Sequence, residues 1–390
     1  MQIVILGAGY AGLRAALDLD LLLRERKRTD TVILVDQCPY HQLVQVLHHT
    51  VASSAPVQEA IYDLATLLSK SKVRFVQGRA AKLAPQACQV ILEDGQLLTY
   101  DRLVITLGAE TAYQVPGAEA NTLDLRTYEH AVRLHNHLIA QFTAAAKTSD
   151  PQEQRMLLTT AIVGGSYTGC QLAGELAAWA DDLCRETGAP RPQVRIALLE
   201  RGHLLLRDFG LWATREAERA LDKLGVSVYL DTSVESVEPR ALLVEGGQVL
   251  RAATLVWAAG VKGPDLLRAS GLPVDATGHV RTDRFLRVLE NPLIFAAGDC
   301  AVIPDPFAGQ VPATASYAMR QGSHLADSLM AELEGREPRL YDPARLGGLV
   351  SLGPEYAVGN PLGIPLTGYP AVLMKKSIER WYRFLLTDQS

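Results

Sequence analysis

Two glycine-rich turns have the spacing needed to hold a dinucleotide. They read Gly7-Ala8-Gly9-Tyr10-Ala11-Gly12 and Gly164-Gly165-Ser166-Tyr167-Thr168-Gly169. In a GxGxxG turn the first glycine makes the tight turn and the second lets the backbone approach a pyrophosphate. The third allows close packing of the helix, whose N-terminus supplies amide donors. Ser166 replaces the second glycine of the later copy, so that copy is imperfect and a purely structural turn is its alternative interpretation.

An acidic residue follows each turn at the end of the next predicted strand. Asp36 closes TVILVD and precedes Gln37, and Glu200 closes VRIALLE and precedes Arg201. A carboxylate in this place accepts hydrogen bonds from the hydroxyls of an adenosine ribose and repels a 2′-phosphate. Glu200 therefore favours NADH, whereas Arg201 would receive the phosphate of NADPH if Glu200 turned away.

Three more predicted strands end in glycine. They are followed by Gly108, by Ala259-Gly260 and by Gly298-Asp299. An aspartate beside such a turn can bind a chain of hydroxyl groups, or it can simply cap the next helix.

These residues need strands that end, and helices that begin, at one edge of a sheet. Each glycine turn lies between a strand-like run and a helical run, and the two copies are far apart in the chain. The sequence therefore predicts an α/β fold with two Rossmann-like dinucleotide-binding domains. Further helices are expected over residues 316–334 and 372–386.

Composition excludes several other classes of protein. The 390 residues are 48% hydrophobic and 21% charged, as in a soluble globular chain, and the net charge of −5 does not favour nucleic acid as a partner. No apolar run is long enough to cross a membrane, and a strand-like run starts at Gln2, so we expect a cytoplasmic protein.

The five cysteines form no CxxC pair, which argues against a dithiol that exchanges with a flavin. His41, His48 and His49 have no metal-site spacing, and we expect polar or core roles for them and no catalytic metal.

The ordered set of GAGYAG, the Gly108 strand end, GGSYTG with Glu200, WAAGV and AAGDC resembles the pyridine-nucleotide flavoprotein reductase superfamily. The resemblance implies that the first unit binds FAD, that Asp299 holds the flavin ribityl chain, and that the second unit binds NADH or NADPH. It divides the chain into residues 1–115 and 276–335 for FAD, 116–275 for NAD(P)H with connecting helices, and a C-terminal region over 336–390.

Within that superfamily the chain most resembles the type II NADH dehydrogenases, which are single-subunit NAD(P)H:quinone oxidoreductases. The segments that carry this resemblance are Pro39–His48, the TGCQLAGEL helix and Val311–Gly322. Gln171 stands where the family usually has an acid, and Ser316, Arg320 and Gln321 stand in its quinone-side motif after Ala315. The layout is also similar to a plastid and cyanobacterial branch that reduces a demethylated naphthoquinone.

The resemblance implies hydride transfer from NAD(P)H to flavin N5, followed by transfer of two electrons to a quinone. Gln171 and Glu175 are the candidates near the nicotinamide, and Tyr10, Ala11 and His41 are expected to lie beside the flavin. The alternatives are a soluble reductase of a protein electron carrier and a flavin redox sensor with little turnover.

A basic amphipathic helix is expected near the C-terminus. Met374, Ile378, Trp381, Tyr382 and Leu385 are predicted to share an apolar face, opposite Lys375, Lys376, Arg380 and Arg383. Such a helix can lie in a membrane interface, here the inner face of a membrane, or pack as an ordinary surface helix. The sequence leaves a monomer and a homodimer open.

Overall fold

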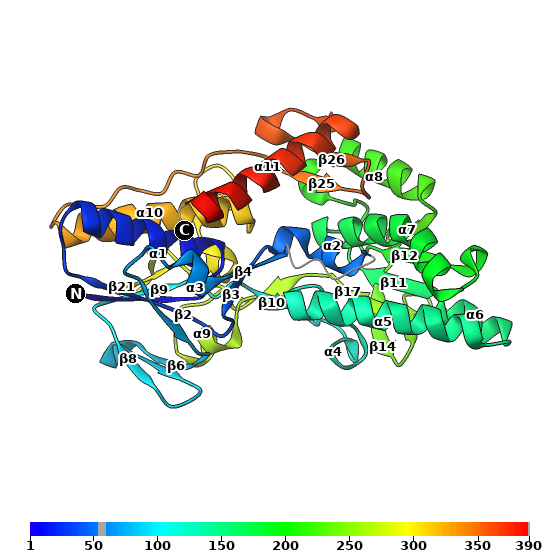
Figure 1. Ribbon diagram of the computed structural model, residues 1–390, viewed down its shortest axis with the longest axis horizontal. Coiled ribbons are helices and arrows are strands. Elements are labelled where there is room, and N and C mark those ends of the chain that lie inside the picture. The colour runs from blue at the N-terminus through cyan, green and yellow to red at the C-terminus, as the bar shows by residue number, and fades with distance from the viewer. Residues whose placement is uncertain (54–59, 389–390) are drawn as a thin grey trace.

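Two α/β units lie next to each other along the length of the molecule (Figure 1). The computed structural model describes residues 1–53 and 60–388. The first unit is built from the beginning of the chain and from a later segment that returns to it, and the second from the middle of the chain. The α/β class with two dinucleotide-type units is therefore confirmed.

The first unit contains a six-stranded sheet in the order β20-β21-β9-β1-β2-β5. Its five longer strands are parallel, and only the edge strand β20 is antiparallel. The central strands are continuous apolar runs because a parallel sheet is covered on both faces. The strands are β1 (Gln2–Leu6), β2 (Thr31–Asp36), β5 (Arg74–Gln77), β9 (Arg102–Ile105), β20 (Arg287–Val288) and β21 (Asn291–Ala296).

The second unit repeats this plan with four parallel strands in the order β13-β12-β11-β17. The strands are β11 (Thr159–Val163), β12 (Arg195–Leu199), β13 (Val226–Tyr229) and β17 (Thr254–Trp257).

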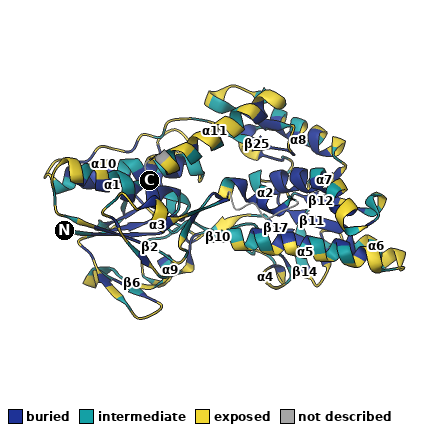
Figure 2. Cartoon of the chain, viewed as in Figure 1, coloured by how far each residue is buried: buried dark blue, intermediate teal, exposed yellow. Residues whose placement is uncertain are grey.

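Helices cover one face of each parallel sheet, and a three-stranded antiparallel sheet covers the other. In the first unit α1 (Tyr10–Glu25) packs along α10 (Ala315–Leu333), and β6 (Ala80–Ala84), β7 (Gln89–Leu92) and β8 (Leu97–Thr99) lie opposite. In the second unit α5 (Tyr128–Lys147) and α7 (Tyr167–Thr187) lie opposite β14 (Val234–Glu238), β15 (Ala241–Val244) and β16 (Gln248–Arg251). Figure 2 shows the result, with dark buried strands inside and exposed residues on the outer sides of the helices.

The chain crosses between the units on two short strands that pair with each other. They are β10 (Glu110–Thr111) and β18 (Val261–Lys262). The next helix, α9 (Asp265–Ala269), packs on β6, and Leu267 and Leu272 belong to the core of the first unit. The return crossing thus lies at β18, before the boundary at residue 275 that the sequence indicates.

The remaining elements are short and lie mostly at the edges of the two units. They are α2 (Leu47–Val51), α3 (Leu64–Leu67), α4 (Ala118–Asn121), α6 (Pro151–Leu157), α8 (Leu211–Lys223), and the pairs β3 (Tyr40–Gln42) with β4 (Ile61–Asp63), β19 (Val280–Arg281) with β22 (Ala301–Val302), and β23 (Pro304–Asp305) with β24 (Gly309–Gln310).

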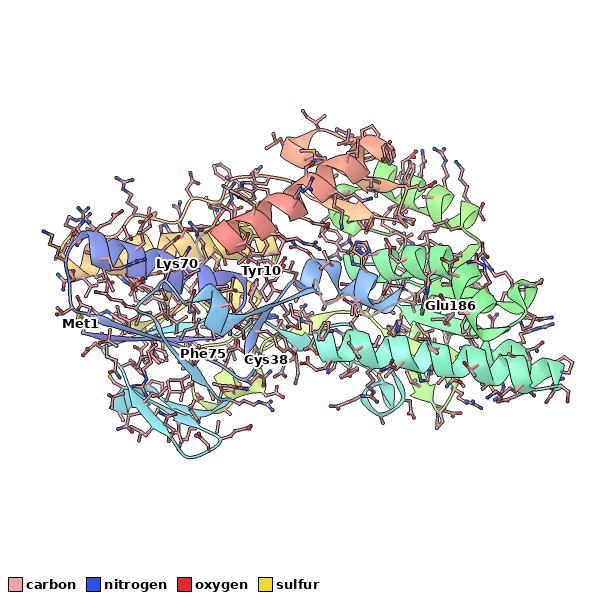
Figure 3. All side chains as sticks on the ribbon, in the orientation of Figure 1. Met1, Tyr10, Cys38, Lys70, Phe75 and Glu186 are labelled. Carbon is pink, nitrogen blue, oxygen red and sulfur yellow. The ribbon has the colours of Figure 1, made fainter. Side chains whose placement is uncertain are left out.

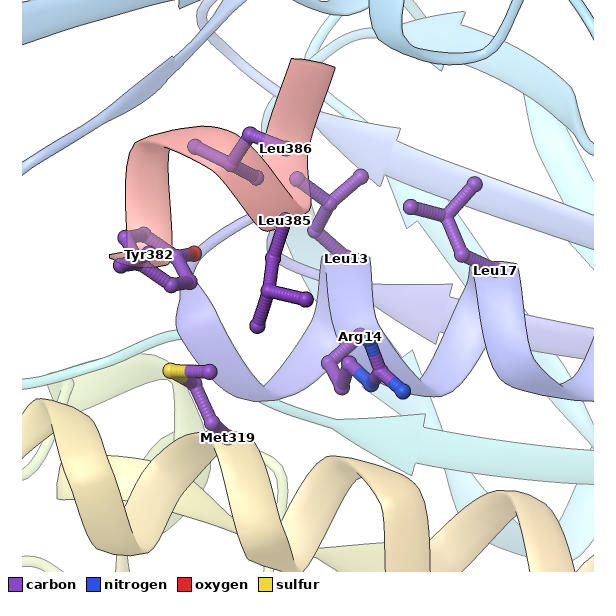
Figure 4. A pocket seen from close by; sticks show the side chains of 7 residues that line it. All are labelled: Leu13, Arg14, Leu17, Met319, Tyr382, Leu385 and Leu386. Carbon is purple, nitrogen blue, oxygen red and sulfur yellow. The ribbon is translucent and has the colours of Figure 1, made fainter. Parts of the chain in front are cut away.

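The C-terminal region forms a small sheet and the long helix α11 (Tyr369–Asp388). The sheet consists of β25 (Leu349–Ser351), β26 (Ala357–Gly359) and β27 (Leu366–Thr367), and α11 starts against it. Its last turns reach the first unit, where Tyr382, Leu385 and Leu386 line a small apolar pocket with Leu13 and Met319 (Figure 4).

The predicted apolar face of α11 is wrong in detail. Tyr382 is 6% exposed, whereas Ile378 and Trp381 are 49% and 56% exposed. Only a narrow stripe of α11 packs on the body. The other apolar residues of the helix therefore lie on a second side, which is exposed. Lys375, expected on the solvated basic face, is largely covered and pairs with Glu379.

Among the described residues, no helix has both the length and the apolarity required to cross a bilayer.

Candidate functional site

The two glycine turns have the same backbone geometry. Gly7 N donates to Val35 O and Gly164 N donates to Leu199 O, both at 2.7 Å. The φ angles of Gly7 and Gly164 are +97° and +114°, a region that side chains disfavour, so glycine is required at both positions. The second turn is therefore a structural copy of the first.

The third glycine of each turn is needed for close packing. A Cβ on Gly12 would lie 1.9 Å from Gly7 O, and one on Gly169 would lie 1.9 Å from Gly164 O. Each helix thus rests directly on the strand end before it.

The serine that interrupts the second motif is tolerated for a geometric reason. Ser166 has φ −78° and Gly9 has φ −71°, so both are in the extended region that any residue adopts. A Cβ on Gly9 would have no other protein atom within 4 Å of it. The middle position therefore borders open space, which is where an approaching pyrophosphate would lie.

The helices that follow these turns have N-termini without a side-chain cap. Neither Gly9 before α1 nor Ser166 before α7 supplies a capping hydrogen bond, and Thr314 before α10 supplies none. By contrast, Thr127 and Asp150 cap α5 and α6. Uncapped amide groups at the start of a long helix are suited to an anionic group. The residues present therefore fit two dinucleotides.

The two predicted ribose acids are held in the same way. Asp36 accepts from Ala8 N at 2.6 Å and Cys38 N at 2.8 Å. Glu200 accepts from Gly165 N at 2.7 Å and Gly202 N at 2.8 Å. Burial raises the pKa of Asp36, and the hydrogen bonds from the backbone amides oppose that shift. Each carboxylate therefore fixes its glycine turn.

The side chains beside these acids point elsewhere. Gln37 is exposed, and its backbone carbonyl, not its side chain, accepts from Gln77 Nε2. Arg201 is exposed, and its Nη1 lies 3.5 Å from Gln114 Oε1. Gln114 also lies against Gly260, whose φ is +89°. Arg201 and the Ala259-Gly260 turn thus share one neighbour in the crossing segment.

The Gly298-Asp299 turn is stabilised from two other elements. Gly298 N donates to Gln321 Oε1 at 2.7 Å, and Arg126 Nη2 donates to Asp299 Oδ2 at 2.9 Å. Gly298 also lies against Ala11, so α1 and this turn are in contact. Gly108 has φ +70° and follows β9 at the same end of the sheet.

The predicted quinone-side residues do not share one face of α10. Gln321 is buried against Gly298, whereas Arg320 is exposed and Ser316 Oγ pairs with Thr314 Oγ1. Ala315 is the first residue of α10.

Tyr167 and Thr168 are partly exposed at the start of α7, and the Tyr167 ring stacks on Phe209.

His41 links the first turn to the C-terminal helix. Its Nδ1 lies 2.8 Å from Ala8 O and its Nε2 lies 2.9 Å from Tyr382 Oη. Tyr10 contacts both rings. Burial lowers the pKa of His41 to about 4, so its imidazole is neutral near neutral pH. Both ring nitrogens of His41 therefore have hydrogen-bond partners.

Gln171 and Glu175 lie on the same face of α7, one turn apart, and both are buried. Gln171 Nε2 lies 3.3 Å from Ser351 Oγ, and Glu175 Oε1 lies 3.6 Å from His49 Nδ1. The side-chain atoms of His48, His49 and Glu175 that could coordinate a metal ion all lie within 4.8 Å of one another. The structure thus joins residues whose spacing in the sequence did not connect them.

Several contacts were missed because no local pattern announces them. Thr106 Oγ1 bonds to the carbonyl groups of Leu6 and Gly7, and Arg126 reaches Asp299 from the crossing segment. Ser351 and Tyr382 come from the C-terminal region. Only the tertiary fold brings these residues to the glycine turns or, for Ser351, to α2 and α7.

The five cysteines are unpaired and separate from one another. Cys170, Cys184 and Cys300 are buried, as expected of small apolar residues. Burial raises the pKa of Cys38 to about 11 and that of Cys300 to about 12, which keeps both thiols protonated.

The whole chain resembles curated type II enzymes. It is 29% identical over 385 residues to a "Type II NADH:quinone oxidoreductase" of Staphylococcus aureus, covering 97% of this chain and 94% of that protein. The protein of the same name from Staphylococcus haemolyticus matches equally.

Solved structures share the fold. NDH2 from Plasmodium falciparum in complex with NADH superposes with a TM-score of 0.88 at 16% identity, covering 100% of this chain and 97% of that one. The sulfide:quinone oxidoreductase from Aquifex aeolicus gives a TM-score of 0.79 at 20% identity, with 100% and 92% covered.

The family comparison covers both glycine turns, the acid after each, and the Gly298-Asp299 turn. A family profile described as pyridine nucleotide-disulphide oxidoreductase matches residues 1–322. The chain therefore belongs to the pyridine nucleotide-disulphide oxidoreductase family.

Proposed function

We propose that this chain is an FAD-dependent NAD(P)H:quinone oxidoreductase of type II. The observation that carries the proposal is the pair of matched turns, each with an uncapped helix and an acid held by amides, and with open space at Gly9 in the first. The similarity over nearly the full length to the staphylococcal type II enzymes supports a quinone as acceptor.

FAD would be held by the first turn together with Asp36, Gly108, Gly298 and Asp299. When bound, FAD accepts two electrons from the nicotinamide and passes them to the quinone. The protein would bind and orient the two partners: the amides at the start of α1 would hold one pyrophosphate, and the Gln321 and Arg126 side chains keep the Gly298-Asp299 turn in place.

NAD(P)H would be held by the second turn, with the Ala259-Gly260 turn on its nicotinamide side. Glu200 supplies a carboxylate for the adenosine ribose and disfavours a 2′-phosphate. Its two amide contacts keep this charge at the turn, which supports NADH as the better donor.

The outer surface of α11 supports a membrane-bound acceptor. Leu373, Ile378, Trp381 and Phe384 are each about half exposed, and Leu362 and Ile364 on the preceding loop are 68% and 66% exposed. We define these six residues as the apolar strip. Lys376 and Arg380 are exposed on the same helix, as expected of a surface that meets anionic lipid headgroups. These exposed residues support peripheral association with the inner face of a membrane as part of the proposal, and pairing of two copies through the strip is the competing use.

A small pocket with an almost entirely apolar lining lies between α1, α10 and α11, beside the helix that carries the strip. Its volume is only about 20 Å³, which is room for about one water molecule, so it does not hold a quinone and does not distinguish between acceptors. The exposed apolar strip is what supports a lipid-soluble acceptor, such as a naphthoquinone, over a protein carrier.

Stopped-flow absorbance tests the proposal. Protein carrying FAD should bleach on mixing with NADH, and more slowly with NADPH, and should recover within seconds on addition of a short-chain naphthoquinone. Bleaching without recovery by any quinone would contradict the proposed acceptor and direct the search to protein carriers or to a sensing role.

A further inference from the structure

Two histidines and a glutamate from different parts of the chain meet beside α7. They are His48 and His49 on α2 and Glu175 on α7, and we name them the α2–α7 cluster. One nitrogen of each imidazole and one oxygen of the carboxylate all lie within 4.8 Å of one another. Two imidazoles with one carboxylate are a set of donors that transition-metal ions bind in proteins.

The separation of these atoms is close to that of ligands around one ion. Zinc bonds of about 2.0–2.1 Å in a tetrahedral arrangement place neighbouring ligand atoms roughly 3.3 Å apart. His49 Nδ1 and Glu175 Oε1 are 3.6 Å apart, which is too long for a hydrogen bond and near the separation of two ligands. The widest of the three separations is at most 4.8 Å, and rotation of the side chains about an ion can close it.

The Glu175 carboxylate is the strongest indication that the cluster takes a ligand. Glu175 is 6% exposed, and its Oε1 atom is buried without a hydrogen-bond partner in the part of the chain that the structure describes. Buried charges in proteins are normally paired or coordinate a metal ion. Because Oε1 faces His49 Nδ1, a cation held between these two atoms would satisfy both.

One side of the cluster is open to solvent. The His49 side chain is 37% exposed, whereas that of Glu175 is 8% exposed, and His48 is 3% exposed as a residue. An ion can therefore arrive past His49. Three protein ligands leave the fourth position of a tetrahedral ion to water, which this open side would supply.

Neutral side chains hold the inner histidine in place. Ser351 Oγ on β25 lies 3.3 Å from His48 Nε2, and Gln171 Nε2 lies 3.3 Å from Ser351 Oγ. Contacts of this kind orient the imidazoles of metal sites. The positive charge of Lys375 on α11 lies near the His48 ring, and Glu379, with which Lys375 pairs, offsets its repulsion of a second cation.

The donor types favour zinc over magnesium or calcium. Magnesium and calcium prefer oxygen ligands, whereas two of the three donors here are imidazole nitrogens. Zinc accepts two histidines and one glutamate with water as the fourth ligand. We infer that the α2–α7 cluster binds one Zn²⁺ ion through His48, His49 and Glu175. The proposed electron transfer does not use this ion, so the inference goes beyond the proposed function.

The ion would join two parts of the molecule. The helix α2 follows β3 in the chain and packs on α5 and α7 of the second unit (Figure 1). The helix α7 starts directly after the second glycine turn. Coordination would therefore fix a segment that leads out of the first unit to the helix of the second turn. Because the unfolded chain does not present this set of ligands, the ion would stabilise the folded state.

Zinc binding to the purified full-length protein tests the inference. The protein is treated with EDTA, freed of the chelator, and titrated with Zn²⁺ in competition with a chromophoric chelator. One ion per chain should bind, and it should raise the midpoint of thermal unfolding by roughly 3 °C or more. Co²⁺ in place of Zn²⁺ should give the visible absorption of a four-coordinate ion, at wavelengths beyond the flavin bands.

Three variants remove parts of the site. Ser351→Ala removes only an outer contact and should lower the affinity for Zn²⁺ by about 10- to 100-fold. Glu175→Gln and His49→Gln each remove a ligand and should lower it further, with loss of the cobalt absorption. Because His49 is partly exposed, His49→Gln should fold even where a buried glutamine at position 175 is not tolerated. The unfolding midpoint of each metal-free variant checks this.

Two control variants remove similar groups elsewhere. Glu186→Gln removes a carboxylate from an exposed position farther along α7 (Figure 3). His203→Gln removes an exposed histidine that pairs with Asp231. Both variants should bind Zn²⁺ as the unmodified protein does.

The outcomes decide between the cluster and other places on the protein. Absence of stoichiometric binding, or binding that Glu175→Gln and His49→Gln leave unchanged, would overturn the inference. Loss of binding in His203→Gln would place the ion at a surface pair and would overturn it as well. Electron transfer from NADH to a quinone is a separate measurement, so failure of the proposed function can be distinguished from failure of the zinc site.

Discussion

At the scale of single residues, the acid at the end of a strand does two things at once. Glu200 would select the donor through its charge, and it already accepts hydrogen bonds from Gly165 and Gly202. A substitution can therefore alter cofactor choice and the shape of the turn together, and the design of variants has to separate the two.

Glu200→Gln keeps the size of the side chain and one acceptor but removes the charge. We expect kcat/KM for NADH to fall about 10-fold, equivalent to about 1.4 kcal/mol, while the value for NADPH changes little or rises. Steady-state rates with both donors provide the measurement. An unchanged ratio of the two donors would exclude Glu200 as the ribose ligand. Glu186→Gln is the matched control for the loss of a carboxylate.

A second residue-scale effect concerns His41 and pH. Its pKa in the folded protein is about 4, below the value of roughly 6.5 in an unfolded chain. Between these values the unfolded chain holds a proton that the folded chain lacks, so stability is present above about pH 6.5 and is lost as pH falls toward 4. The maximum loss from this residue is about 3 kcal/mol.

Urea unfolding at pH 7.5, 6 and 5 measures this dependence in the protein and in His41→Asn. The variant should be less stable at pH 7.5, because the contacts with Ala8 and Tyr382 are weakened, and its stability should fall less steeply with acid. Parallel curves for the two proteins would show that His41 does not titrate with folding.

At the scale of elements, one turn contains two glycines that serve different purposes. Gly9 borders open space and has an ordinary φ, whereas a Cβ on Gly12 would meet Gly7 O at 1.9 Å. Replacing each of the two glycines by alanine therefore separates an effect on FAD binding from an effect on the free energy of unfolding.

Gly9→Ala should leave the free energy of unfolding of the FAD-free protein within about 0.5 kcal/mol but reduce the retention of FAD. Gly12→Ala should cost about 1–3 kcal/mol before any cofactor is added, because the helix must move away from the strand. Denaturation of the FAD-free protein and the flavin content after purification are the two measurements. Equal stability of the two variants would contradict the packing argument.

At the scale of the whole molecule, α11 connects the two ends of the chain. The Tyr382 ring contacts Tyr10 of the first glycine turn, while the outer side of the same helix carries part of the apolar strip. Because α11 packs on the body with one side, the aromatic residues Trp381 and Phe384 on its other side stay exposed and are available to a binding surface.

A double change, Trp381→Ser with Phe384→Ser, tests what covers the strip. Binding to vesicles that contain anionic lipid should fall at least 10-fold in a sedimentation assay, and electron transfer from NADH to ferricyanide should stay unchanged. A control variant on the side of α11 that packs on the body, such as Tyr382→Phe, should bind vesicles as the unmodified protein does. A shift from dimer to monomer without loss of vesicle binding would assign the strip to a second copy instead.

The sequence by itself determined the repeated parts of this protein. GAGYAG, GGSYTG, Asp36 and Glu200 are local patterns, because a glycine turn and the acid one strand later are specified by neighbours along the chain. They predicted the two α/β units and the matched turns, and the structure explains even the irregular Ser166. The apolar spacing in α11 predicted a helix but could not say which side would be covered, since several apolar residues lay on both.

Only the tertiary structure decided how distant residues meet. Arg126 with Asp299, His41 with Tyr382, and Glu175 with His49 are pairs from different elements, and no spacing along the chain specifies them. The return crossing at β18 and the buried side of α11 were likewise set by packing. The physical reason is that turns and helix starts are fixed by backbone sterics within a few residues, whereas side-chain contacts depend on how completed elements pack.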